Sequence, residues 1–282
     1  MPFNALYNRS VNVNNNTLLI TGGTHRSGSN STLLKSSFLV SWDYNESSTG
    51  KFSQINNYTL LVREYAEMKE ERSRHNIIFL PDKNAVFVCS TIDKKPNVTA
   101  EITYLNRKNT SWELIKPKLR ESRGNATMAY ISDRYIYCIA GFQYEGSKYL
   151  QSLEYIDTTT FDEWKYVDFN TNMTFKELGG KCTMGVIHIK NNDFVIFGGF
   201  DGSNSYCKDS YEVNFDNLEK PSINKIQIEN MGDVNIFYSQ SFLNVGEGKF
   251  VNFNLKCMRY LYDSSEKRLD VTNDSYEYNN PK

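Results

Sequence analysis

Short apolar runs that stop at small residues recur along the chain. In the most complete copy, four consecutive apolar residues, Phe194 to Phe197, are followed by Gly198-Gly199. Such a run is typical of a strand that is buried on both faces, and glycines allow a sharp turn at positive φ. The copies are Thr17–Gly23, Asn84–Ser90, Tyr135–Gly141, Phe194–Gly199 and a degenerate Lys249–Leu255. They lie about 50 to 67 residues apart, a period that favours a propeller over short helical repeats.

Two further landmarks accompany each copy. After it comes an alternating strand that ends in an apolar residue and then Asp or Asn, as in Leu153–Asp157. The Asp or Asn opens a hairpin turn, and the returning strand begins with a large apolar residue such as Trp112 or Trp164. Before each copy lies a strand rich in small and β-branched residues. Each unit therefore predicts four strands, and such units repeated radially form a β-propeller.

The repeat predicts a single domain over residues 1–282. Its blades are expected at approximately 5–60, 72–117, 120–169, 180–228 and 233–272. One segment departs from the pattern, because Val62–Arg72 is highly charged and contains good helix formers. We expect a solvated connecting loop there, with a docking helix as the alternative.

Charge and composition narrow the classes of partner. A formal charge of −1 at pH 7 and a pI of about 6.3 give no electrostatic reason to expect binding to nucleic acid or to an acidic membrane surface. No apolar run approaches the length of a membrane span, and the first residues lack the apolar region of a signal peptide. The five widely spaced cysteines favour reduced thiols and therefore a cytoplasmic location.

With these landmarks, the chain resembles the kelch-repeat β-propellers. The family pattern is an Arg before the inner strand, a strand that ends in Gly-Gly, a Tyr-Asp type of turn, and a Trp. The third unit matches it nearly throughout, with Arg123, Ala140-Gly141, Tyr155-Ile156-Asp157 and Trp164. The resemblance implies an all-β, kelch-type β-propeller of four-stranded blades. Five blades are visible, and an incomplete six-bladed ring is the alternative.

The resemblance also implies a binding function on one rim of the propeller. The loops after each glycine pair and the segments before each inner strand are expected to emerge there. The candidate partner-binding residues carried over by position are Arg9, His25, Arg26, Arg74, Asp93, Arg123, Phe142, Tyr144, Phe200 and Asp201. Arginine with exposed aromatic residues is typical of binding hot spots, and the basic bias favours an acidic peptide segment. Alternatively, Arg74 and Arg123 hydrogen-bond backbone carbonyls between blades.

We therefore expect a non-enzymatic scaffold or adaptor that binds a partner protein or peptide. A cytoskeletal or ubiquitin-ligase component is a candidate partner, and a filament-associated structural protein is the alternative function. A propeller enzyme such as a metal oxidase is less favoured, because such a site needs at least two His, two Tyr and a Cys. The chain has only His25, His75 and His188, and it lacks zinc-ligand spacing, phosphate loops and a nucleophile motif. We expect no metal and no cofactor.

Overall fold

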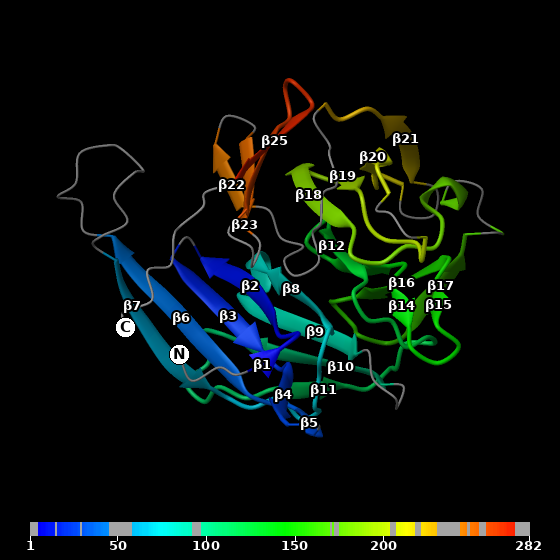
Figure 1. Cartoon of the computed structure of the whole chain (residues 1–282). Helices are drawn as coiled ribbons and strands as arrows, with labels where there is room; N and C mark the ends of the chain where they lie inside the picture. Colours follow the sequence, from blue (N-terminus) through cyan, green and yellow to red (C-terminus); the bar gives the residue numbers. More distant parts are fainter. Residues whose placement is uncertain are drawn as a thin grey trace.

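The computed structural model describes residues 5–14, 16–28, 30–44, 58–91, 97–169, 171, 175–203, 207–217, 221–229, 243–246, 249–253 and 258–273. In these ranges the protein is all-β, and helix is confined to two 3-10 turns, η1 (Pro81–Lys83) and η2 (Lys176–Leu178). The strands form antiparallel four-stranded sheets around a common centre, which is a β-propeller arrangement (Figure 1). None of the helical turns in these ranges is long and apolar enough to cross a membrane.

Four blades follow one another along the chain, and each is a meander whose strands run in sequence order from the innermost outward. Blade 1 contains β2 (Arg9–Asn14), β3 (Thr17–Thr21), β6 (Ser37–Tyr44) and β7 (Tyr58–Tyr65). Blade 2 contains β8 (Asn76–Leu80), β9 (Ala85–Thr91), β10 (Asn97–Tyr104) and β11 (Glu113–Ile115). Blade 3 contains β12 (Thr127–Ile131), β13 (Tyr135–Ile139), β16 (Ser152–Asp157) and β17 (Trp164–Asp168). Blade 4 contains β18 (Gly185–Lys190), β19 (Asp193–Phe197), β20 (Ser210–Asn214) and β21 (Ser222–Ile226).

The core of the molecule lies between neighbouring blades. One buried cluster joins blades 1 and 2 through Val11, Val88 and Trp112. Others join blade 2 to blade 3 and blade 3 to blade 4. The innermost strands β2, β8, β12 and β18 contact one another in turn. The second strands β9, β13 and β19 are almost wholly buried, because a sheet is covered on each face by the blades beside it.

A further four-stranded sheet follows blade 4. It contains β22 (Leu243–Gly246), β23 (Lys249–Phe253), β24 (Met258–Asp263) and β25 (Arg268–Asn273). Its described side chains, including Tyr262 and Leu269, pack against blade 4. Backbone pairing, inner-strand contacts and side-chain packing on both sides together define four blades, not the five that the sequence predicted. The fifth sheet is described mainly through its backbone, so its place in a closed ring stays a prediction.

Five short strands lie outside the blades. They are β1 (Ala5–Leu6), β4 (Thr24–Ser27) and β5 (Asn30–Leu33), which form one small sheet, and the β14 (Phe142–Gln143) and β15 (Lys148–Tyr149) hairpin. Both hairpins directly follow the second strand of their blade. They lie at the lower side of the propeller in Figure 1.

The sequence landmarks fall where the repeat predicts them. The five apolar runs form β3, β9, β13, β19 and β23, and Trp164 opens β17. The prediction for Val62–Arg72 is wrong in its first part, because β7 continues to Tyr65 and pairs with β6 along its whole length. Alternating apolar residues precede the charged run and are typical of a strand. Pairing with β6 extends this strand into the first charged residues. The part after Tyr65 has no regular secondary structure.

Candidate partner-binding rim

The hairpin rim is the surface where the post-glycine loops meet the segments that precede the inner strands. Backbone pairing joins the two sets of loops in three blades. Leu6 pairs with Thr24 between β1 and β4, Gly124 with Phe142, and Cys182 with Phe200. The hairpin rim therefore comprises residues 5–8, 24–33, 142–149 and 200–203, together with segments 72–75, 122–126 and 180–184. The structure thus brings together the two loop sets that the sequence placed at one rim.

A ring of left-handed residues links the blades at this rim. Tyr7, Arg74, Asn125 and Thr183 each lie two residues before an inner strand and have φ values of 62°, 50°, 51° and 56°. The N–H of Arg74 donates to the carbonyl of Tyr7, that of Asn125 to Arg74, and that of Thr183 to Asn125, at 2.8–2.9 Å. Each blade is thereby hydrogen-bonded to the next. The three hydrogen bonds thus link the four blades in series at the rim.

A second set of contacts clasps each blade to its successor. The first residue of an inner strand uses its side chain to bind the residue just before the next inner strand. The Nε of Arg9 donates to the carbonyl of His75 at 3.0 Å, and Arg9 also donates to the side chain of Asn125. Asn76 accepts the N–H of Ala126 at 2.7 Å. Arg9 is only 5% exposed, so its position is structural and leaves little surface for a partner.

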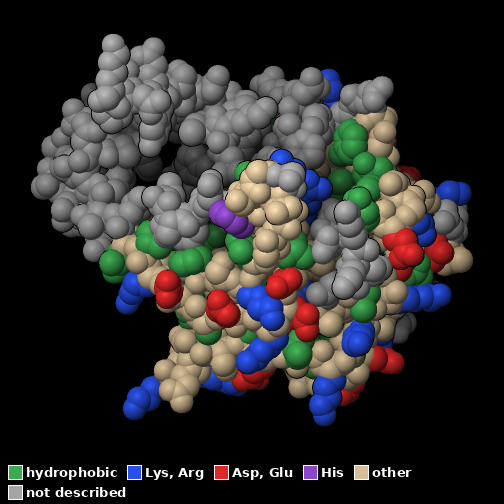
Figure 2. Space-filling model, turned by 60° about the horizontal axis from the view of Figure 1, so that its bottom comes forward, with side chains coloured by type: hydrophobic (Ala, Val, Ile, Leu, Met, Phe, Trp, Pro, Cys, Tyr) green, Lys and Arg blue, Asp and Glu red, His purple; other side chains and the backbone are tan. Residues whose placement is uncertain are grey.

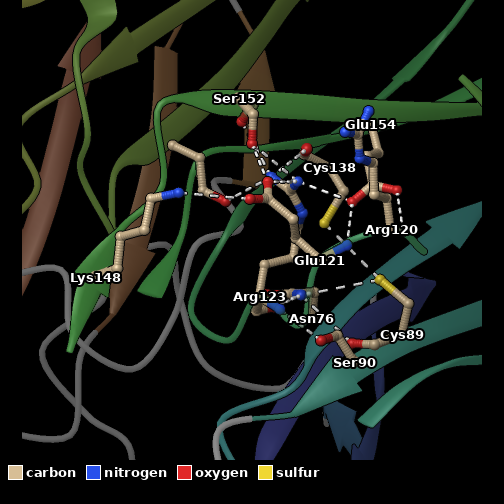
Figure 3. A network of polar contacts seen from close by, with 11 residues as sticks. Asn76, Cys89, Ser90, Arg120, Glu121, Arg123, Cys138, Lys148, Ser152 and Glu154 are labelled. Atoms are coloured by element: carbon tan, nitrogen blue, oxygen red, sulfur yellow. Dashed lines mark hydrogen bonds and ion pairs between the residues drawn. The ribbon is translucent and has the colours of Figure 1, made fainter. Parts of the chain in front are cut away.

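Arg123 lies in the interior of blade 3, as Figure 3 shows. Its guanidinium donates to the carbonyls of Ala140 and Ser152, both at 3.0 Å, and forms an ion pair of 2.8 Å with Glu154. Both side chains are completely buried. The structure therefore buries Arg123 away from the exposed rim, and its hydrogen bonds to backbone carbonyls lie within blade 3 and not between blades, as the alternative had them.

Glu154 completes this network from its own strand, β16. Its carboxylate accepts the backbone N–H groups of Arg120 and Glu121, at 2.6 and 3.1 Å. A buried carboxylate needs such donors, because an unpaired charge in the interior is very costly. The Arg123–Glu154 pair thus fixes the segment that leads into β12.

Blade 2 contains an equivalent pair that the sequence reasoning missed. Arg72 and Glu101 form a buried ion pair of 2.9 Å, and Arg72 also donates to the carbonyl of Ser90 at 3.2 Å. Arg72 lies four residues before its inner strand, as Arg123 does. The arginine of this blade that corresponds by position to Arg123 is therefore Arg72 and not Arg74. The chain offers both within three residues, and spacing to the inner strand is the signal that distinguishes them.

Arg74 instead lies at the centre of the rim and is partly exposed. Its guanidinium lies 3.8 Å from the centre of the Tyr7 ring, a cation–π contact. No carboxylate in the described part of the chain pairs with it. Burial raises the pKa of the Cys182 thiol to about 11, although Arg9 and Arg74 act in the opposite direction.

The hairpins carry the remaining candidates. His25 and Arg26 are exposed on β4, and Tyr144 is 50% exposed on the loop between β14 and β15. Asp201 is also exposed; its pKa is lowered mainly by hydrogen bonds from Ser203. Asp93 lies outside the described residues.

Phe142 and Phe200 are half-buried, and Tyr149 lies between them. The centre of the Tyr149 ring is 5.0 Å from that of Phe142 and 5.7 Å from that of Phe200, both edge-to-face. Sequence reasoning missed Tyr149, because it precedes no landmark. The three rings join blade 3 to blade 4 in an aromatic cluster on the rim. Such clusters provide rigid contact area in protein interfaces.

Charges of both signs are distributed over the face of the molecule that carries the hairpins. In Figure 2, where the lower side of Figure 1 comes forward, Lys and Arg side chains are interspersed with Asp and Glu. The three histidines are not brought together, since His75 is buried and His188 lies on β18, away from the hairpin of His25. In the described part of the chain, no group of three or more His, Cys, Asp or Glu side chains could hold a metal ion.

Comparisons with known proteins agree with this architecture. No family model matches the chain. The chain is 25% identical over 181 residues to Kelch repeat and BTB domain-containing protein 1 of cowpox virus (strain Brighton Red), which covers 64% of this chain and 30% of that protein. It is 26% identical over 129 residues to the protein of the same name from ectromelia virus (strain Moscow), covering 46% and 21%. These matches support the resemblance to the kelch-repeat β-propellers.

The chain spans less than a third of the length of these kelch-repeat relatives. The solved structure of YjhT superposes with a TM-score of 0.57 at 12% identity, covering 93% of this chain and 73% of that one. At this identity the likeness shows the fold alone. The sequence matches therefore support kelch-type repeats, and the structural match supports the overall fold.

Proposed function

We propose that the chain is a non-catalytic scaffold that binds a partner protein or peptide on the hairpin rim. One observation carries this proposal: the guanidinium of Arg74 lies on Tyr7 where backbone hydrogen bonds link the blades in series, without a carboxylate partner in the described residues. A charged group held in one place before binding loses little conformational entropy when a partner arrives. The kelch-repeat proteins of cowpox and ectromelia viruses support the assignment to a class of interaction proteins.

The chemistry of the rim favours an acidic segment in the partner. Arg74 offers a planar fork of donors that matches a carboxylate, and Arg26 adds a second exposed guanidinium on β4. Tyr144 and the Phe142–Tyr149–Phe200 cluster supply apolar contact beside this charge. Asp201 would repel an acidic group. We therefore expect the acidic residues of the partner to lie near the axis of the propeller and not beside Asp201.

Two statements about the whole protein belong to the same proposal. We infer that the fifth sheet, β22–β25, completes a five-bladed ring, because Tyr262 and Leu269 pack on blade 4 as the earlier blades pack on one another. We also infer a cytoplasmic location, which is supported by free thiols at Cys89, Cys138, Cys182 and Cys207.

Affinity capture with matched variants tests the proposed function. The full chain and Arg74→Gln are used as baits, because Gln keeps part of the side-chain stem and removes the charge. Arg107→Gln is the control: Arg107 lies 3.8 Å from the ring centre of Tyr104, the same contact as in Arg74 and Tyr7, but outside the hairpin rim. Partners lost with Arg74→Gln and Tyr144→Ala but kept with Arg107→Gln support the rim.

Equal capture by all these baits, with unchanged melting temperatures, would contradict the proposal. Identification of the captured proteins also distinguishes the partner classes that the resemblance implies, a ubiquitin-ligase component and a cytoskeletal filament. A direct measurement of affinity for the identified partner, as salt is raised, then tests the role of charge. Affinity should fall with salt for the wild type and much less for Arg74→Gln.

A further inference from the structure

A cavity lies among the innermost strands of the propeller. Its volume is about 300 Å³, and residues from the innermost strands of all four blades line it. The walls are mostly apolar and include Val11, Ile77, Phe79, Met128 and Val186. The lining runs from the start of the inner strands, as at Met128 and Val186, to the turns at Pro81 and Asp133, and it includes none of the residues of the hairpin rim. The cavity is therefore separate from the site of the proposed function.

The polar groups that line this cavity include hydrogen-bond acceptors. The Nε2 of His188 is 2.6 Å from the carbonyl of Asn191, which can only accept, so Nε2 carries the proton and Nδ1 is free to accept. The Asp133 carboxylate is exposed and has no hydrogen-bond partner in the described part of the chain. Asn12 adds an amide group from β2, whose oxygen can accept and whose NH2 can donate. Together they surround the apolar walls with acceptors from three different blades.

The nearby cation, Lys83, is already saturated. Its ammonium group donates to Asp82 at 2.5 Å, to the hydroxyl of Tyr130 at 3.0 Å and to the carbonyl of Asp133 at 3.3 Å. An ammonium group has three hydrogen-bond donors, and all three are used. Asp82 balances the charge of Lys83, whereas the Asp133 carboxylate, which lines the cavity, has no ion pair in the described part of the chain. The arrangement disfavours an anion and favours a cation.

We propose that this cavity binds a small organic ammonium ion with a compact apolar body. The ammonium group would lie at the Asp133 carboxylate and His188 Nδ1, and the ring of Tyr130 would add a cation–π contact. The apolar body would be buried among Val11, Met128 and Val186. A volume of about 300 Å³ is at the lower end of the range for ligand sites, so the ligand has few heavy atoms. This site goes beyond the proposed function, because it does not involve the hairpin rim.

Ligand-observed NMR on the full chain tests the proposal. The probe is 2-phenylethylammonium, the neutral comparison is 2-phenylethanol, and the anionic comparison is 3-phenylpropionate. We expect a dissociation constant on the order of 1 mM for the ammonium, the affinity that ligands of this size reach. We expect roughly tenfold weaker binding of the alcohol, because it lacks the charge, and no competition by the carboxylate. Equal binding of all three probes would overturn the proposal.

Three variants locate the binding. Asp133→Asn removes the carboxylate from an exposed turn and should weaken ammonium binding to the level of the alcohol. Asp162→Asn is the matched control, since Asp162 is also exposed but does not line the cavity. Val186→Trp fills the cavity and should abolish binding of both probes. Ammonium binding that is unchanged in Asp133→Asn would overturn the proposal even if Val186→Trp failed to fold.

Discussion

Each blade has a corner, the backbone turn that follows its second strand. Blades 3 and 4 stabilise this corner with different side chains. In blade 3, Arg123 and Glu154 form a buried ion pair whose members also bind backbone groups. In blade 4 the equivalent residues are Lys181 and Tyr211, and Lys181 pairs with Asp209, whose side chain is 38% exposed. The Tyr211 hydroxyl donates to the carbonyl of Glu177, so a neutral donor holds the preceding segment where Glu154 holds it as an acceptor.

The backbone at the corner differs in the same way. In blade 3 the left-handed corner residue is Ala140, with φ of 53°, and Arg123 donates to its carbonyl. In blade 2 the corner residue is Ser90, with φ of 57°, and Arg72 donates to its carbonyl. In blade 4 the corner residue is Gly198, which adopts positive φ without steric cost. The two blades whose corner residue is a strained non-glycine therefore have a buried arginine at this place. The blade whose corner residue is glycine has a lysine there.

The largest expected effect distinguishes the two ion pairs. Arg123→Ala should destabilise the protein by about 3–5 kcal/mol, because it leaves Glu154 buried without its counter-charge. Lys181→Ala should cost less than about 1 kcal/mol, because Asp209 stays partly in water. Urea unfolding of both variants provides the comparison. Similar losses of unfolding free energy in both would show that the blades are fixed by the same forces.

Alanine substitutions at the two glycines of blade 4 distinguish the cost of backbone strain from the cost of close side-chain contacts. A Cβ at Gly199 would lie 2.7 Å from Cγ of Met184 and 2.9 Å from the carbonyl oxygen of Cys182, at a φ of 94°. Gly199→Ala should therefore cost about 2–3 kcal/mol. A Cβ at Gly198 would meet only the Cys207 carbonyl, at 3.7 Å, so Gly198→Ala should cost about 1 kcal/mol, the strain of a left-handed residue.

Melting temperatures of the two glycine variants test this difference. The Gly198→Ala variant is the control for the left-handed backbone, since only Gly199→Ala adds close contacts. If Gly198→Ala were the more damaging, the corner of blade 4 would depend on strain alone and not on the close approach of Met184.

A smaller effect should appear with pH and only at the junction of blades 1 and 2. His75 is completely buried, and its Nε2 lies 2.7 Å from the hydroxyl of Thr21, whereas Nδ1 has no partner in the described residues. Burial, with the positive charges of Arg72 and Arg9, holds the pKa of His75 well below 6.5. The equivalent residues of blades 3 and 4 are Ala126 and Met184, which do not titrate.

The neutral form of His75 is therefore the one that the folded state favours. Its contribution to stability is complete above the unfolded pKa of about 6.5 and is lost as pH falls below it, by at most about 1.4 kcal/mol per pH unit. Urea unfolding at pH 7.5 and pH 5.5 measures this loss. His75→Gln should reduce the difference between the two pH values, whereas His25→Gln, at an exposed position, should not. An unchanged pH dependence in His75→Gln would contradict the assignment.

The architecture could be predicted from the sequence because it rests on local patterns. An apolar run followed by small residues, as in Phe194–Gly199, forms the second strand of a four-stranded sheet, although the five copies overcounted the four blades that the structure defines. The register of the arginines could not be predicted, because Arg72 and Arg74 are both plausible by position. The side chain of Glu101, on β10, is completely buried and pairs with Arg72. This pairing is the reason that Arg72 is buried and Arg74 is not.

The rim was predicted as a place but not residue by residue. Positions such as His25, Arg26 and Tyr144 were assigned to loops by their distance from a glycine pair, and loops are exposed by default. Arg9 and Arg123 were not distinguishable from them, because burial depends on acceptors that other strands and blades provide. Tyr149 was missed because its role depends on aromatic partners, Phe142 and Phe200, that come from two different blades.

The clasps between blades have a direction along the chain. Arg9 reaches forward to blade 2, Asn76 to blade 3, and Thr127 donates to the carbonyl of Met184 in blade 4 at 3.1 Å. Each clasp residue is therefore synthesised before its partner. Its side chain lacks this hydrogen-bond partner until the next blade has left the ribosome. We therefore expect the blades to assemble in order from the N-terminus, and we expect a circular permutant that begins at blade 3 to form the clasp of Thr127 first.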